Sequence, residues 1–123
     1  MSLLENLPHR CTIRRRVRSK GTLGGSKDSF TVEQTGVHCW EQKAGDSEIT
    51  EFSKRGIRIS RKVYFVNDPE VTERHQILIT EKSGVVDSDP TPLDVKSTPR
   101  PDADVGFGLL FRVFVDESTG EEN

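Results

Sequence analysis

The sequence contains two histidine–cysteine pairs, and these residue types can take part in catalysis or metal binding. His9 and Cys11 are separated by one residue, and His38 and Cys39 are adjacent. A cysteine beside a histidine can act as a nucleophile, and four such ligands can hold zinc. However, the Cys-x2–4-Cys spacing of structural zinc sites is absent, and no third residue is marked that would orient a base. We therefore expect no metal, no cofactor and no catalytic residues. If the strands that carry the two cysteines pair, the thiols become packed neighbours.

Basic side chains form a second group, which could bind anionic partners. In segment 9–18 arginines alternate with mostly apolar residues, which would place them on one face of a strand. Segment 57–66 alternates in the same way. If these two strands are neighbours, their basic residues form one face that meets phosphates or an acidic protein. The candidate interface or DNA-facing basic face consists of Arg10, Arg14, Arg16, Arg18, Arg58 and Lys62.

The elements that must position these side chains are strands. Period-two alternation predicts them at 9–18, at 30–43 with a break near Gly36, and at 57–66, 75–82 and 107–115, with short strands at 85–86 and 93–96. A glycine- and serine-rich loop joins the first two, at 19–29. The connection 44–56 is either a short helical turn capped by Asp46 or Ser47, or an extended loop. This pattern predicts an all-β fold, a small antiparallel β-barrel or sandwich of five to six strands with long loops.

The inward positions of these strands predict the core. Both faces of segment 107–115 are apolar, so we expect the core to cover one and a partner to cover the other. Trp40 should anchor either the interior or an interface. The predicted core residues are Ile13, Val37, Trp40, Ile57, Ile59, Val63, Phe65, Ile77, Ile79, Leu109, Phe111 and Val113.

Length and charge indicate one domain that assembles. The 123 residues suit a single domain, 1–123, with a flexible N-terminal arm (1–8) and an acidic C-terminal tail (116–123). A hydrophobic share of 32% predicts a thin core, which favours an oligomer. Residues 1–62 carry a net charge of +6 and residues 63–123 carry −8. This asymmetry fits either a head-to-tail assembly or an unrelated basic strand and acidic tail. No apolar run is long enough to span a membrane, and no signal peptide is expected.

Several motifs, in order and spacing, resemble a known family. They are Leu7-Pro8-His9-Arg10, Gly36-Val37-x-Cys39-Trp40, Thr50-Glu51-Phe52-x-Lys54-Arg55-Gly56, Lys62-Val63-Tyr64-Phe65 with Asp68-Pro69, Arg74-His75 and Gly108-Leu109-Leu110-Phe111-Arg112-Val113. Over residues 4–115 the chain resembles the head–tail joining proteins of tailed bacteriophages, also called head-closure, head-completion or stopper proteins. Segment 87–104 is longer than the family's short linker, and Phe111 stands where a tryptophan is usual.

The resemblance implies a structural virion protein and not an enzyme. It implies a small β-barrel that assembles with itself into a dodecameric ring in the neck, in the virion, after assembly in the cytoplasm of the host bacterium. The partners would be the portal or head–tail adaptor protein above, the tail completion or terminator protein below, and packaged double-stranded DNA in the channel. The lumen-facing gate would be loop 43–56, with Lys43, Asp46, Glu48, Glu51, Lys54 and Arg55. The alternative is a small β-barrel that binds nucleic acid without a neck.

Overall fold

The computed structural model describes residues 7–20, 26–101 and 110–117, and these residues form eight strands and one helix. The helix in this part of the chain is not long and apolar enough to cross a membrane. In chain order the elements are β1 (His9–Lys20), β2 (Ser26–Lys43), α1 (Asp46–Ser53), β3 (Arg61–Phe65), β4 (His75–Lys82), β5 (Val85–Val86), β6 (Leu93–Val95), β7 (Arg100–Pro101) and β8 (Phe111–Glu117).

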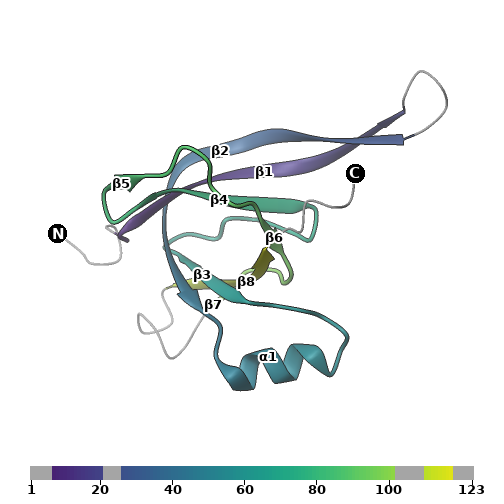
Figure 1. Ribbon diagram of the computed structural model, residues 1–123, viewed down its shortest axis with the longest axis vertical. Coiled ribbons are helices and arrows are strands. Elements are labelled where there is room, and N and C mark those ends of the chain that lie inside the picture. The colour runs from purple at the N-terminus through teal and green to yellow at the C-terminus, as the bar shows by residue number, and fades with distance from the viewer. Residues whose placement is uncertain (1–6, 21–25, 102–109, 118–123) are drawn as a thin grey trace.

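Six of the strands close into an antiparallel barrel (Figure 1). Their order is β1-β2-β3-β8-β6-β4, and β4 returns to pair with β1, so this sheet has no free edge along the barrel. The two-residue strands β5 and β7 add to β4 and β8. The prediction of an all-β fold is confirmed, and the architecture is the barrel rather than the sandwich.

Strands β1 and β2 continue past the barrel as a two-stranded ribbon (Figure 1). β1 pairs with β4 only over His9–Arg15, and β2 pairs with β3 only over Cys39–Lys43, so the remainder of each strand pairs only with the other. The predicted 19–29 loop was too long because both strands extend into it. Gly36 has a φ of +63° and lies where two residues of β2 face one of β1. The predicted break near Gly36 is therefore a β-bulge.

The barrel interior is filled mainly by small and branched side chains, which suits the narrow lumen of six strands. Cys11, Ile13, Cys39, Val63 and Val113 are fully buried there. Of the predicted core, the buried residues are Ile13, Ile59, Val63, Phe65, Ile77, Ile79 and Val113. The partly buried ones are Val37, Trp40, Ile57 and Phe111, and Leu109 lies outside the described residues.

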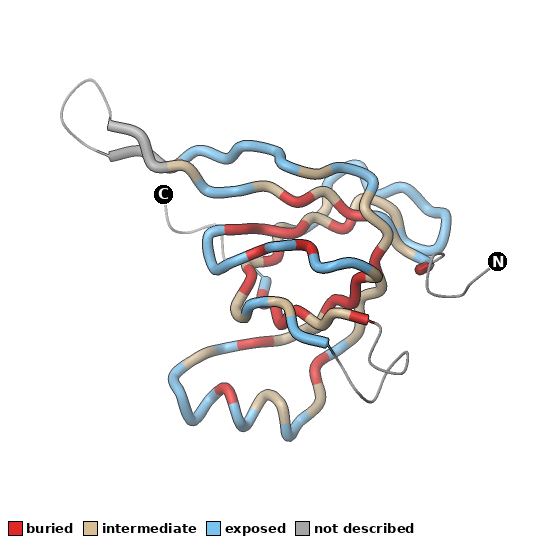
Figure 2. Tube along the Cα trace, turned by 180° about the vertical axis from the view of Figure 1, so that it is seen from behind, coloured by how far each residue is buried: buried red, intermediate tan, exposed pale blue. Residues whose placement is uncertain are grey.

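The outer face of β8 was predicted to be covered by a partner, but the chain itself covers it. Phe114 packs against Phe52 of α1, and Leu110 packs with Tyr64 and Leu7. The chain's own helix and N-terminal segment therefore cover this face, whereas the sequence analysis assigned it to a partner. Figure 2 shows the resulting burial along the trace.

Two further strands begin or end at residues other than those predicted, and one short strand was missed. β3 begins at Arg61, four residues later than predicted. Ile57 and Ile59 pack with Phe52 of α1, while the N–H of Ser60 still donates to the carbonyl of Val115 in β8. β8 runs from Phe111 to Glu117, so its end lies beyond the predicted 115. The short β7 was missed because it contains Pro101, and proline is rarely expected in a strand except at an edge.

Candidate interaction surfaces

The two cysteines lie next to each other inside the barrel, as expected if their strands pair. Both are free thiols that are fully buried. Hydrogen bonding with Cys11, followed by burial, raises the pKa of Cys39 far above its ordinary value, so this thiol stays protonated. His9 and His38 bond to other groups: the Nδ1 of His9 accepts from the N–H of Ser83. Within the described residues no group of three or more histidine, cysteine, aspartate or glutamate side chains could hold a metal ion.

The predicted gate segment contains a helix that is docked on the barrel. The helical alternative was right, although the predicted caps Asp46 and Ser47 were wrong, because Gly45 is the N-cap. Phe52 is buried from one face of the helix, and its ring centroid lies 4.8 Å from that of Phe114. Five of the six predicted gate residues are exposed to solvent, namely Lys43, Asp46, Glu51, Lys54 and Arg55. Whether they face a channel stays a prediction.

Glu48 ties the helix to the strands beneath it. Its Oε1 accepts from the N–H of Gly45 at 2.9 Å and from Nζ of Lys62 at 3.0 Å, and its Oε2 lies 3.5 Å from Arg112. Burial alone would raise the pKa of Glu48. The Gly45 and Lys62 hydrogen bonds and the charges of Lys62 and Arg112 outweigh burial and lower that pKa below its ordinary value. The carboxylate therefore stays ionised at neutral pH.

The predicted basic face is not one surface. β1 pairs with β2 and β4, and β2 lies between β1 and β3, so the assumed pairing of the first and third predicted strands is wrong. Lys62 is only 17% exposed and is bound to Glu48. Arg10 lies at the start of β1, far from Arg18 near its end, and its Nε is 3.9 Å from a carboxylate oxygen of Glu81. Arg18 lies on the ribbon, and its side chain is outside the described residues.

A second arrangement brings basic residues together that the sequence analysis did not connect. Two adjoining hollows, of about 450 and 430 Å³, share Ile57, Glu73 and Lys96. We call them together the basic groove. Its acidic lining residues are Glu73 and Asp94. Its basic lining residues are Arg16, Arg55, Arg58, Lys96, Arg100 and Arg112.

The charges of the basic groove are only partly compensated. Arg16 lies 4.0 Å from Asp94, and Arg58 lies 3.5 Å from Asp116. Within the described part of the chain, Lys96 and Arg100 form no ion pair. Because cations attract anionic groups, the basic groove is a candidate site for phosphate or carboxylate. Lys96, Arg100 and Arg112 are far in sequence from the other basic residues of the groove, so no local sequence pattern connects the two sets.

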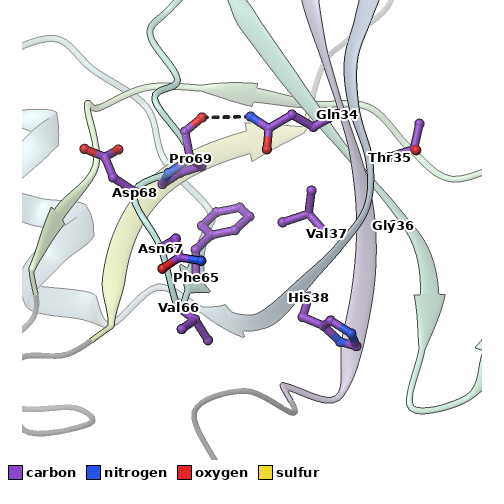
Figure 3. Close-up of a pocket in the computed structure, with 10 residues that line it drawn as sticks. All are labelled: Gln34, Thr35, Gly36, Val37, His38, Phe65, Val66, Asn67, Asp68 and Pro69. Atoms are coloured by element: carbon purple, nitrogen blue, oxygen red, sulfur yellow. Dashed lines mark hydrogen bonds between the residues drawn. The ribbon is translucent and has the colours of Figure 1, made fainter.

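A third hollow, of about 390 Å³, lies where β2 diverges from the end of β3 (Figure 3). Val37 and Phe65 form its apolar side, and His38, Asn67 and Asp68 provide polar groups. The side-chain amide of Gln34 donates a 3.1 Å hydrogen bond to the carbonyl of Pro69. Apolar and polar side chains therefore line the same crevice.

Comparison with known proteins gives a likeness of fold. No family model matches the sequence, and no curated protein matches it. The structure is similar to the solution structure of protein SF1141 from Shigella flexneri 2a, with a TM-score of 0.66 and 14% sequence identity over the whole of both chains. At this identity the likeness shows a shared fold alone.

Proposed function

We propose that this protein is a structural neck protein of a tailed bacteriophage, a head-closure or stopper protein. It forms a ring between the portal or its adaptor and the tail, retains the packaged DNA in the head and provides the platform to which the tail attaches. The observation that carries this proposal is the ordered series of motifs over residues 4–115 that resembles the head–tail joining proteins. The small closed β-barrel agrees with the fold that this resemblance implies.

The positions of the motif residues add support. Trp40 stacks on Tyr64 with ring centroids 5.4 Å apart, and Tyr64 is buried. Phe52 holds α1 on β8, and Gly36 and Gly56 adopt positive φ angles of +63° and +74°. Several of the residues that carry the resemblance are therefore ones on which this fold depends.

A deletion of the gene in the phage genome that encodes this chain tests the proposal. We expect heads that package DNA and then lose it, together with unattached tails, and we expect the plasmid-borne gene to restore intact particles. Electron microscopy and a nuclease-protection assay of head DNA measure both effects. DNA-filled heads that acquire tails without the protein would refute the assignment.

The basic groove favours a second candidate, a barrel that binds nucleic acid. Phosphate binding releases counter-ions, so affinity would fall steeply with salt concentration. Binding of a labelled DNA duplex, titrated with salt, tests this candidate with Lys96→Ala and Arg100→Ala. Each substitution should reduce the salt slope by roughly one, whereas Lys54→Ala, at the exposed C-cap of α1, should leave it unchanged. Equal slopes for all variants would exclude the groove as the nucleic-acid site.

A further inference from the structure

One hollow of the basic groove, of about 430 Å³, lies between α1 and the barrel. Figure 1 shows α1 on the side of the barrel away from the ribbon. Phe52 and Arg55 line this hollow from the helix and the residues that follow it, and Arg112 and Phe114 line it from β8. Polar lining residues from β6 to β7 are Lys96, Ser97, Thr98 and Arg100. We call this hollow the α1 hollow.

Like charges meet at the α1 hollow. Four of its lining residues are basic and one, Glu73, is acidic. The register of β7 and β8 places Arg100 directly opposite Arg112, so these two cations are neighbours across the strands. Like charges in directly opposite positions destabilise a sheet. An anion placed beside them would offset this repulsion.

The protein compensates only part of this positive charge. A carboxylate oxygen of Glu48 lies 3.5 Å from Arg112. Across residues 7–20, 26–101 and 110–117 no ion pair is formed by the three other cations, Arg55, Lys96 and Arg100. Glu73 is exposed and likewise forms no ion pair in these ranges, so it neutralises none of the three. The α1 hollow therefore keeps a net positive lining.

Two hydroxyl groups complete the lining. The Oγ of Ser97 accepts a 3.0 Å hydrogen bond from the N–H of Phe114, and this bond does not use its own O–H. Thr98, the next residue, is exposed and also lines the hollow. A phosphoryl group offers three acceptor oxygens and more than one negative charge, whereas a carboxylate offers two oxygens and a single charge. Several cations together with hydroxyl donors therefore favour a phosphoryl group.

A ligand in the α1 hollow would contact both the helix and the barrel. Arg55 lies just after α1, whereas Lys96 and Arg100 lie beyond β6. The helix has eight residues, which is too short to be stable alone, and it docks through Phe52 and Glu48. A ligand that binds only when helix and barrel are together stabilises that arrangement by mass action.

We propose that the α1 hollow binds a phosphoryl group, and that the bound group fastens α1 to the barrel by joining Arg55 to Lys96 and Arg100. Its negative charge offsets the repulsion among these cations, so the helix docks more firmly when the group is present. The group belongs to free phosphate or to the backbone of a nucleic acid. A role of α1 in a gate rests on the proposed neck function, whereas the binding site does not depend on it.

Amide hydrogen exchange of the full chain, followed by NMR at fixed pH, tests this coupling. Sodium phosphate is the first probe, and sodium chloride at equal ionic strength is the reference, because chloride only screens. The amides of Ile49 and Lys54 report on α1, since they donate to the carbonyls of Gly45 and Thr50. If phosphate binds only the docked helix, their exchange should slow about ten-fold at roughly ten times the dissociation constant.

Variants separate the site from the general stabilising effect of phosphate, which is excluded from protein surfaces. Arg100→Ala should remove both the slowing and the saturable shifts of the Ser97 and Thr98 amide signals. Arg100 is exposed and forms no ion pair within the described ranges, so this variant should fold. Arg55→Ala should weaken phosphate binding several-fold. Lys54→Ala removes an exposed cation that does not line the hollow, and this matched control should respond as the unchanged protein does.

A short DNA duplex identifies the source of the group. If the duplex shifts the same amide signals and slows exchange in α1, the group belongs to nucleic acid; if only inorganic phosphate does so, it is the free ion. The proposal is overturned if neither probe gives saturable shifts around the hollow, if Arg100→Ala responds like the unchanged protein, or if phosphate binds without slowing exchange in α1. Failure of the proposed function is separate, since it would appear as intact tailed particles in the gene deletion while phosphate still slows this exchange.

Discussion

Replacing Phe52 with alanine tests whether α1 depends on one side chain for its place on the barrel. Phe52 is 9% exposed and packs on Phe114 with ring centroids 4.8 Å apart. Arg55 covers the ring from another side, with its guanidinium carbon 4.6 Å from the centroid. An eight-residue helix is too short to persist without tertiary contacts, so this packing must hold it.

The expected loss follows from the packing. Truncation of a buried phenylalanine to alanine costs about 3–5 kcal/mol. Because Phe52 is the most exposed of the four buried residues in its cluster, we expect the low end of this range, about 3 kcal/mol. A domain of this size has a total stability of about 5–15 kcal/mol, so the loss is a large fraction of it.

Urea unfolding measured by tryptophan fluorescence provides the assay. Trp40 is the single tryptophan and stacks on Tyr64 in the barrel wall, so it reports on the barrel, while far-ultraviolet circular dichroism reports on α1. Glu51→Ala on the exposed face of the same helix is the matched control and should change stability little. A loss below about 1 kcal/mol for Phe52→Ala with an unchanged helical signal would refute the anchoring role.

Three further predictions follow from single contacts. Glu48→Gln should lower the free energy of unfolding at pH 7 by about 1–3 kcal/mol. The folded state lowers the pKa of Glu48, so the ionised carboxylate stabilises the fold at pH values above its unfolded-state pKa. This stabilisation is lost as pH falls through the folded-state pKa. Glu48→Gln should therefore lose less stability than the unchanged protein when the pH is lowered. Phe65→Ala should cost about 3–5 kcal/mol and Phe111→Ala less, since Phe111 is only partly buried. Finally, the thiols of Cys11 and Cys39 should react with Ellman's reagent only as fast as the protein unfolds, and rapid labelling in the native state would contradict their burial.

The strands that the sequence predicted best are those with clear alternation and a clear end. β4 matches the predicted 75–82 and β5 matches 85–86, because apolar alternation stops at the Ser83-Gly84 turn. Alternation could not predict how far β1 and β2 extend into the ribbon, since their side chains there are mostly polar while the backbone still pairs. It also could not decide what covers the outer face of β8, because a strand pattern shows two apolar faces and not the element packed on each.

The basic groove shows a similar limit for sites. Arg14 and Arg16 were predicted to share a face because they are two residues apart on one strand. Of these two, only Arg16 lines the basic groove, and Lys96 and Arg100, far along the chain, join it there through closure of the barrel. Lys62 was assigned to the basic face by alternation, but Glu48 of α1 covers it. Contacts between distant segments depend on topology, which local spacing does not specify.

An electron cryomicroscopy reconstruction of the neck, from virions of the phage that encodes this chain, tests the central proposal most directly. The proposal predicts a ring between the portal or its adaptor and the tail, in which each subunit has density for the six-stranded barrel, the projecting β1–β2 ribbon and α1. Purified virions that contain no copies of the chain by mass spectrometry, or a neck with no ring that fits this barrel, would contradict it.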